Sequence, residues 1–370
     1  HNPDRQDAVI MVKHSLFIAF GALLLTACAT PQAPVERVDT SMLVYPPPPE
    51  TARFYFERSI MGSADIEKVD AETKWRRALT GEAVISMGMS KPYDVESCQG
   101  TIFVSDTVSR LVYRFNVPTG EFDQIGTKDP GILRKPLGLA TDEDCNIYVA
   151  DQTAERIVKY DSSGRFMDAW GGAEMFDRLS HVEVDPAGER LYVVDTGGVR
   201  SERHHIRVID TASGEVLFDI GKRGARDGEL NLPRDIAMGS DGNLYVVDGG
   251  NFRVQVFTTE GRFLSSMGRI GSRTGNFSRP KGIDTDSEGN VYVSDAAFGN
   301  FQIFNRDGQL LLFVGDRAAE IGPGKFMLPA GIALDEDGRV YMVDQFFRKV
   351  DVFRPAGLKE NEGFLGLRAN

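Results

Sequence analysis

The chain has 370 residues, 41% of them hydrophobic and 26% charged, which is enough to bury the core of one large all-β domain or of two ordinary domains. The formal net charge is -12, with acidic residues spread through many short turns, and this argues against the basic stripe that nucleic-acid binding needs. Apart from a shorter run near the start, no apolar segment approaches the roughly 20 residues of a membrane-spanning helix.

The apolar run near the start has the layout of an export signal. Residues 11–14 form a short basic segment, residues 15–25 are apolar, and small residues follow. The motif LTAC, ending at Cys28, resembles the lipobox of bacterial lipoproteins, so residues 1–27 are predicted to be removed and Cys28 to carry lipid. An ordinary secreted protein with a stray cysteine is the alternative. Residues 1–10 precede the first methionine and are left out of the fold prediction as upstream sequence or a misplaced start.

The residues after Cys28 predict a tether and a location. Ala29, rather than aspartate, follows the cysteine, which resembles the outer-membrane sorting pattern of two-membrane bacteria. Residues 28–50 are rich in proline and favour extended or polyproline II structure. We therefore expect a domain held off the surface of the cell envelope, with the lipid as its only membrane contact.

Two elements are expected before the repeats that dominate the rest of the chain. Residues 52–60, ARFYFERSI, alternate apolar and polar side chains as a β-strand does. Residues 66–79 place apolar side chains, among them Trp75 and Leu79, at amphipathic spacing. This spacing predicts a short helix packed against the domain.

A strand followed by aspartate recurs six times along the chain. The copies are IFVSD, IYVAD, LYVVD, LYVVD, VYVSD and VYMVD, and they end at Asp106, Asp151, Asp195, Asp248, Asp295 and Asp344. Their spacings of 45, 44, 53, 47 and 49 residues are too long for helical-hairpin repeats and fit four-stranded propeller blades. The sequence therefore predicts an all-β, six-bladed β-propeller over residues 51–354, with residues 355–370 as a C-terminal tail.

Each repeat supplies the antiparallel strands of one blade. The innermost strand starts at KPYDV, KPLGL, LPRDI, RPKGI or LPAGI, with LSHVEVD as the deviant third copy. Three strands of β-branched and aromatic residues follow, separated by turns that contain Asp or Gly. The sixth copy lacks its outer strand, so residues 52–60 are predicted to close the ring, which removes an open sheet edge. Residues 363–367, GFLGL, are the alternative closing strand.

The repeated motifs P-x-G-I-A-x-D, GN-x-YV-x-D, N-x-R-x-QVF and G-x-F-x-x-x-G resemble those of NHL-repeat proteins. Over residues 44–354 the layout is similar to that of six-bladed propeller lipoproteins of bacterial envelopes, including the segment VYPPPPETARFYFERSI. The resemblance implies the fold but no single activity, because the same propeller serves scaffolds, sugar-lactone hydrolases and peptide-amidating lyases.

The acidic residues shared by the repeats are interpreted as structural. A catalytic group is not needed six times, so the repeated aspartate is predicted to accept hydrogen bonds from backbone N–H groups in turns. The acidic turns at 142–145, 286–289 and 335–338 are interpreted as hairpin turns, because they lack the ligand series of a calcium loop.

Positions at which the repeats differ are the candidates for function. The residue two places after the proline position varies among aspartate, glycine and histidine, and it should ring one mouth of the channel. Blades one and four face each other, which sets Asp94 across from Asp235 with His181 beside Asp235. The candidate site for a ligand or a divalent cation comprises Asp94, His181, Asp235, Tyr93, Arg234 and Lys281. In the alternative, the aspartates pair with the neighbouring cations or with backbone amides.

An insertion in the third repeat, residues 195–210, is a second candidate. It carries a basic cluster on an acidic protein, formed by Arg200, Arg203, His204 and His205. Adjacent residues of a strand point to opposite faces, so the two histidines are not expected to share one metal ion. The loop is either a recognition surface or a solvated loop.

Cys98 and Cys145 fall in equivalent turns of consecutive repeats. A disulfide between them would persist in an oxidising compartment. Two separate buried thiols are the alternative.

The sequence favours binding over catalysis. If the resemblance extended to the amidating lyases, it would imply zinc held by histidines from different blades. Here His204 and His205 share one loop, and only His181 lies elsewhere in the domain. A lactonase-like metal site would draw on Glu96, Glu183, Asp94 and Asp235. We therefore expect a monomeric scaffold without a cofactor that binds an envelope protein or polymer through rim loops and the channel mouth. A metal-assisted hydrolase or lyase acting at the channel is the second hypothesis.

Overall fold

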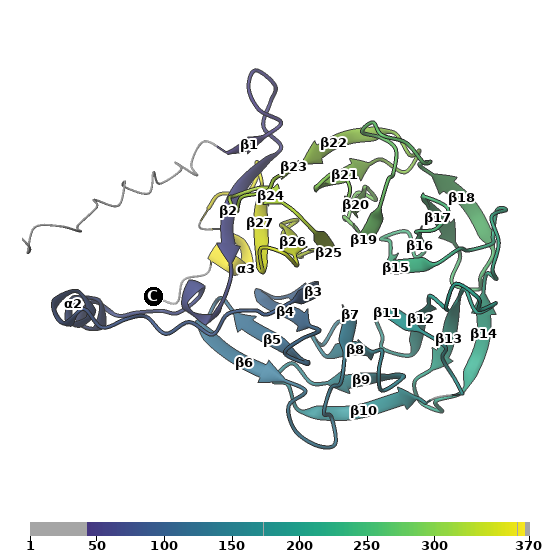
Figure 1. Ribbon diagram of the computed structural model, residues 1–370, viewed down its shortest axis with the longest axis horizontal. Helices are drawn as coiled ribbons and strands as arrows, with labels where there is room; N and C mark the ends of the chain where they lie inside the picture. Colours follow the sequence, from purple (N-terminus) through teal and green to yellow (C-terminus); the bar gives the residue numbers. More distant parts are fainter. Residues whose placement is uncertain (1–42, 173, 361, 367–370) are drawn as a thin grey trace, which may run out of the picture. The chain divides into compact units, whose positions relative to one another are not determined.

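The computed structural model describes residues 43–172, 174–360 and 362–366, which form six antiparallel sheets arranged around a central channel (Figure 1). Each sheet is one blade, and the predicted all-β six-bladed propeller is confirmed. The predicted signal peptide, Cys28 and the first part of the tether lie outside the described residues.

The strands of each blade run from the channel outwards in chain order. Blade one contains β3 (Pro92–Cys98), β4 (Thr101–Asp106), β5 (Leu111–Asn116) and β6 (Glu121–Ile125). Blade two contains β7 (Pro136–Thr141), β8 (Ile147–Asp151), β9 (Arg156–Tyr160) and β10 (Phe166–Gly171). Blade three contains β11 (Leu179–Val184), β12 (Arg190–Asp195), β13 (His205–Asp210) and β14 (Val216–Ile220). Blade four contains β15 (Pro233–Met238), β16 (Leu244–Asp248), β17 (Arg253–Phe257) and β18 (Phe263–Met267). Blade five contains β19 (Pro280–Thr285), β20 (Val291–Asp295), β21 (Asn300–Phe304) and β22 (Leu310–Val314).

The two ends of the described chain meet in the sixth blade. It contains β25 (Pro329–Leu334), β26 (Val340–Asp344), β27 (Lys349–Pro355), β2 (Phe54–Ile60) and the short β1 (Val44–Tyr45). The side chain of Ser59 donates to Asp351 at 2.6 Å, which adds a polar contact to the β2–β27 ladder. The predicted closure by the early strand is confirmed, while residues 363–366 form the short helix α3 (Gly363–Gly366).

Apolar faces of neighbouring blades pack against each other and form the core. Between blades three and four, for example, Val194 and Ile206 belong to the same buried cluster as Ile236 and Val246. Alternation along each strand sends one set of side chains to each face, so every blade contributes to two such layers. A short parallel pair, β23 (Asp316–Arg317) and β24 (Lys325–Phe326), lies in the connection between blades five and six.

The repeated aspartate holds the start of each inner strand. In the first blade Asp106, which is completely buried, accepts hydrogen bonds from the backbone N–H groups of Ser90 and Lys91 at 2.7 and 2.8 Å. The equivalent aspartates of the other five blades are equally buried and accept from the backbone at the same place. The repeated carboxylate therefore has the structural role predicted from its recurrence.

The segment between β2 and β3 differs from its prediction. After the 3-10 turn η3 (Ser63–Asp65), the helix α2 (Ala71–Thr80) starts where Asp70 accepts a hydrogen bond from the N–H of Thr73 at 2.6 Å. The helix buries no residue, and Trp75 and Leu79 are 66% and 68% exposed. The predicted packing of this helix against the ring was therefore wrong, because its cap at Asp70 leaves the buried Ile66 outside the helix. Among the described residues, no helix is long and apolar enough to cross a membrane.

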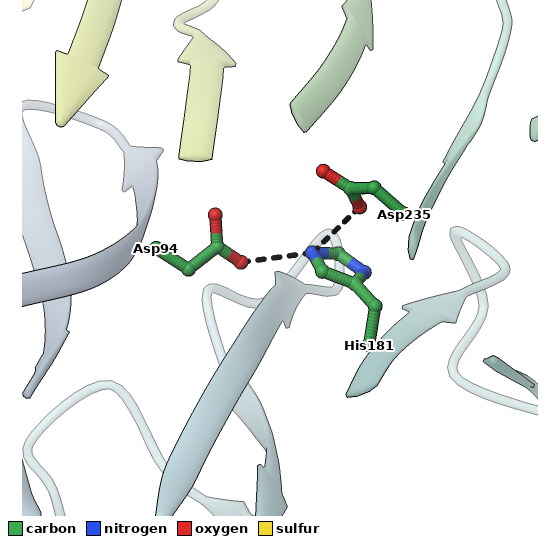
Figure 2. A group of neighbouring side chains, drawn as sticks. All are labelled: Asp94, His181 and Asp235. Carbon is green, nitrogen blue, oxygen red and sulfur yellow. Dashed lines mark hydrogen bonds and ion pairs between the residues drawn. The ribbon is translucent and has the colours of Figure 1, made fainter. Parts of the chain in front are cut away.

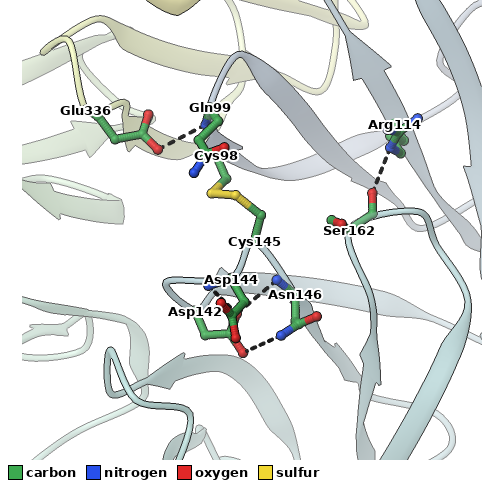
Figure 3. The surroundings of a disulfide bond; sticks show 9 residues. All are labelled: Cys98, Gln99, Arg114, Asp142, Asp144, Cys145, Asn146, Ser162 and Glu336. Carbon is green, nitrogen blue, oxygen red and sulfur yellow. Dashed lines mark hydrogen bonds between the residues drawn. A yellow bond between two sulfur atoms is a disulfide. The ribbon is translucent and has the colours of Figure 1, made fainter.

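A disulfide joins Cys98 of blade one to Cys145 of blade two (Figure 3). Cys145 occupies a turn position that is glycine in four other blades, at Gly100, Gly242, Gly289 and Gly338. Like those glycines, Cys145 has a positive φ, at 58°. A residue with a Cβ atom is disfavoured there, so the cross-link between the blades is made by a cysteine in a strained conformation.

Substituting either cysteine breaks the disulfide, but the two substitutions are expected to lower the free energy of unfolding by different amounts. Cys98→Ser should destabilise the domain by up to about 4 kcal/mol, as expected for opening a long loop. Cys145→Gly should cost about 1 to 2 kcal/mol less, because glycine removes the left-handed strain. Denaturant unfolding with and without a reductant measures both. Under reductant, Cys145→Gly should be more stable than the wild type, and a less stable variant would contradict the strain argument.

Candidate functional site

Three side chains from different blades meet in the channel near one of its ends (Figure 2). His181 Nε2 lies 2.8 Å from Asp94 Oδ2 and 2.9 Å from Asp235 Oδ1, and all three residues are buried. Only about 10 Å³ of open space remains beside them. The structure thus brings together the three residues that the sequence placed around one mouth, but they fill the channel there.

The two carboxylates stabilise the protonated form of the His181 imidazole between them. Burial by itself would lower the pKa of His181, but Asp235 and Asp94 raise it well above its usual value. The aspartates also accept backbone N–H groups of the next blade, Asp94 from Leu139 at 2.9 Å and Asp235 from Ile283 at 3.0 Å. Asp94, His181 and Asp235 therefore form a charged cluster that fills the channel, called the plug below, and its hydrogen bonds link the inner strands of neighbouring blades.

The same three side chains were predicted to hold a divalent cation. One imidazole and two carboxylates, with ligand atoms all within 4.8 Å of one another, are a donor set that suits zinc. However, both distances are within hydrogen-bond range of the single Nε2–H of the imidazole, which the two carboxylates share without a metal ion. His181 Nδ1 is buried without a hydrogen-bond partner among the described residues, whereas metal-bound histidines usually donate this N–H to an acceptor. A cation at this place stays a prediction.

The other residues of the predicted mouth lie outside the plug. Tyr93, Arg234 and Lys281 line the same small cavity, and the two cations are partly buried. Neither of them pairs with a carboxylate of the described residues, so of the alternative prediction only the pairing of the two aspartates with backbone amides is seen. Burial, together with Arg234 and Arg279, lowers the pKa of Lys281 to about 8. This mouth therefore holds two cationic side chains that form no ion pair with the described residues, although Asp94 and Asp235 line the same cavity.

The channel opens at its other end into a funnel of about 910 Å³. The acidic residues that line it are Glu96, Asp142, Glu143, Glu183, Asp185, Asp284 and Glu336. Arg190 is the one basic residue of this lining, and Asp142 is paired with Lys159 at 3.2 Å. The two ends of the channel therefore carry opposite charge.

The deepest carboxylates of the funnel follow a threefold pattern. The fifth residue of each inner strand faces this layer, and it is Glu96, Glu183 and Asp284 in blades one, three and five. In blades two, four and six the same position is Ala140, Ala237 and Ala333. Carboxylates thus alternate with alanines around the axis, and the three alanines are buried in the apolar layers between blades.

Burial and mutual repulsion keep these carboxyl groups partly protonated. Burial raises the pKa of Glu183 to about 7 and that of Asp284 to about 8, and for Asp284 the nearby Glu183 adds to the shift. Burial and then Asp284 raise the pKa of Glu96 well above its usual value. Glu183 and Asp284 each accept two backbone N–H groups, whereas Glu96 accepts none from the described residues.

Sequence reasoning named Glu96 and Glu183 only as metal ligands for a lactonase-like site, and it missed Asp284. The available signal was the alternation of acidic and alanine residues at one strand position. It is visible only after the six inner strands are aligned.

The insertion in blade three presents its arginines and buries its histidines. Arg200 and Arg203 are exposed. The ring of His204 donates to the carbonyl of Gly198 at 3.0 Å and accepts from the N–H of Leu232 at 3.2 Å, which links the insertion to blade four. Burial lowers the pKa of His205. His204 therefore holds the insertion against blade four, His205 is buried at the start of β13, and of the four candidate residues only the arginines are exposed.

Comparisons with known proteins agree with the fold. The NHL repeat family matches residues 230–257, and the predicted resemblance to NHL repeats is confirmed. A structural genomics protein of unknown function from Bacteroides thetaiotaomicron superposes with a TM-score of 0.61 at 18% identity, over 80% of this chain and 75% of that chain. A gluconolactonase from Xanthomonas campestris gives a TM-score of 0.55 at 16% identity, over 81% and 98% of the two chains.

Virginiamycin B lyase from Staphylococcus aureus is also similar, with a TM-score of 0.52 at 13% identity, over 72% of this chain and 95% of that chain. At such identities the likeness shows the propeller fold alone, because unrelated activities share it.

Asp284→Asn is expected to make the stability of the protein less dependent on pH. The pKa of this carboxyl rises from 3.8 to about 8 on folding, so its stabilising contribution is complete at low pH and is lost as the pH rises through about 8. Between about pH 5 and about pH 8 the wild type should lose on the order of 2 kcal/mol more than Asp284→Asn. Denaturant unfolding at several pH values measures this loss.

Asp307→Asn is the matched control, because Asp307 is exposed in a turn away from the funnel. It should keep the pH dependence of the wild type. Equal slopes for all three proteins would contradict the raised pKa of Asp284.

Proposed function

We propose that the protein is a binding scaffold whose acidic funnel receives cationic groups of a ligand or partner in the cell envelope. The observation that carries this proposal is the layer of Glu96, Glu183 and Asp284 at the bottom of a funnel of about 910 Å³. A large concave site with converging polar groups of perturbed pKa is where binding is most expected on a rigid scaffold.

Electrostatics favour an ammonium or guanidinium group over a neutral ligand. The lining carries one basic residue against many acidic ones, and such a cleft concentrates ligands of the opposite charge. A cation among the three carboxyl groups would lower their pKa values, because it stabilises their charged forms. Binding should therefore release protons from the protein near neutral pH.

A metal-assisted hydrolase or lyase is the second candidate. One observation favours it: three carboxylates converge in the funnel, and oxygen donors suit magnesium, calcium or manganese. The gluconolactonase and the virginiamycin B lyase show that the fold can carry enzymes. This function requires a tightly held divalent cation, which the scaffold function does not.

Binding of cationic probes tests the first proposal. Spermidine and a lysine- and arginine-rich peptide should bind in titration calorimetry, with a heat that depends on the buffer because protons are released. The triple variant Glu96→Gln/Glu183→Gln/Asp284→Asn should bind at least about tenfold more weakly, which corresponds to about 1.4 kcal/mol.

The matched control is Glu121→Gln/Glu215→Gln/Asp307→Asn, which makes the same three types of substitution at exposed residues outside the funnel. It should bind like the wild type. Equal loss in both variants, or no binding by the wild type, would overturn the proposal. Tight binding of calcium, magnesium or zinc without any binding of amines would favour the metal-assisted enzyme.

We also propose that Cys28 anchors the protein to the cell envelope through lipid. The support is the sequence of residues 11–28, since these residues lie outside the part that the structure describes. In bacterial cells, Cys28→Ser should move the protein from the membrane fraction to the soluble fraction, and mass spectrometry should find no acylated N-terminal cysteine. Thr30→Ser is the control and should stay in the membrane fraction. Membrane retention of Cys28→Ser would contradict the anchor.

A further inference from the structure

Basic side chains from blades three, four and five gather at the narrow mouth of the channel. Arg234 and Lys281 line the small cavity beside the plug. Arg279 is close enough to Lys281, and Arg178 close enough to Tyr93, for their charges to act on those groups. Arg178 and Arg279 are exposed, whereas Arg234 and Lys281 are partly buried. The mouth is therefore a positively charged recess with an exposed rim.

Within the described residues, none of these four side chains forms an ion pair or donates a hydrogen bond. The protein as a whole carries 54 acidic and 42 basic residues, so carboxylates were available to pair with them. Clustered cations without partners repel one another, and burial followed by the nearby Arg234 and Arg279 lowers the pKa of Lys281. Such an arrangement costs stability, which makes a function for the free charges the natural explanation.

The scaffold fixes the positions of these cations. The backbone N–H groups of Arg178 and Arg279 are bound by the repeated aspartates, Asp195 and Asp295, at 2.8 and 2.9 Å. The side chain of Arg234 lies against Gly249, where an added Cβ atom would come within 2.7 Å of Arg234 Cγ. Gly249 thus leaves the space in which Arg234 reaches the mouth.

Exposed apolar side chains lie on the same face of the ring. The loops that lead into the inner strands, and those between the second and third strands, both emerge at this face because adjacent strands are antiparallel. Their exposed apolar residues are Val108, Ile132, Val199, Ile270, Ile321 and Phe346. Among the described residues, the turns of the opposite face expose no large apolar side chain. Arginine combined with apolar and aromatic side chains is typical of protein interfaces.

We propose that this face docks an acidic segment of a partner protein, whose carboxylates bind over the narrow mouth to Arg178, Arg234, Arg279 and Lys281 while its apolar side chains pack on the surrounding loops. Arg234 and Lys281 lie below the rim, so a protruding side chain reaches them and a flat lipid surface does not. The proposal is independent of the funnel, which lies at the other end of the channel.

Fluorescence polarisation with two labelled peptides tests this docking. One peptide is rich in glutamate, and the other has the same charge with leucines added. Both should bind at low salt, the leucine-containing peptide more tightly, and salt should weaken both. Arg234→Gln/Lys281→Gln should weaken binding at least about tenfold. Its unfolding midpoint should equal or exceed that of the wild type, because the variant removes repelling charges.

Two further variants separate this site from general charge effects. Arg262→Gln/Arg306→Gln makes the same charge change at exposed turn residues of the opposite face and should bind like the wild type. Gly249→Ala should weaken binding without any change in charge, because it displaces Arg234.

Failure of the wild type to bind either peptide would overturn the proposal, and so would equal binding by Arg234→Gln/Lys281→Gln. Vesicles containing phosphatidylglycerol are the remaining probe. If they bind in an Arg234- and Lys281-dependent way while the peptides do not, the face is a membrane contact and the proposal is wrong. Each of these results can be told apart from a failure of the funnel, since the variants there lie at the other end of the channel.

Discussion

One buried carboxylate in each blade determines where the rest of the propeller can go. The inner strands of neighbouring blades do not pair as a sheet, so the loop that leads into each of them needs another partner for its backbone N–H groups. The repeated aspartate supplies that partner from the end of the second strand. Because it lies in the same place six times, the six inner strands start at one height around the axis, and their side chains form layers.

Layers make the two ends of the channel chemically different. Near the starts of the inner strands, a bulge follows each first residue, and the layer there contains Asp94, His181, Asp235 and three glycines. Deeper along the strands, carboxylates alternate with alanines. The first layer is closed by hydrogen bonds and the second lines the open funnel. In the first layer one imidazole contacts two carboxylates at once, whereas the carboxylates of the second layer have no basic partner among the described residues.

The sequence was sufficient for the fold, because its main signals are local and repeated. Strand alternation and the spacing of the aspartates predicted the blades, and the missing last strand pointed to residues 52–60 for closure. The order of the blades around a ring of six also placed Asp94, His181 and Asp235 together. The open funnel was not predicted, since whether a channel is filled depends on side-chain volume across the axis. Similarly, nothing local indicated that His204 would brace two blades or that α2 would leave its apolar residues exposed.

The closure of the ring has a consequence for the order of folding. The contact between Ser59 and Asp351 joins residues 292 positions apart, so a ribosome completes β2 long before it makes the strand that receives it. During that interval Phe54 and Phe56, which are buried in the finished blade, lack the aromatic neighbours Tyr292 and Phe353. The edge of β2 that pairs with β27 therefore stays open until synthesis of the chain is almost complete. A chaperone that protects this strand would act on the last step of assembly, the closing of the circle.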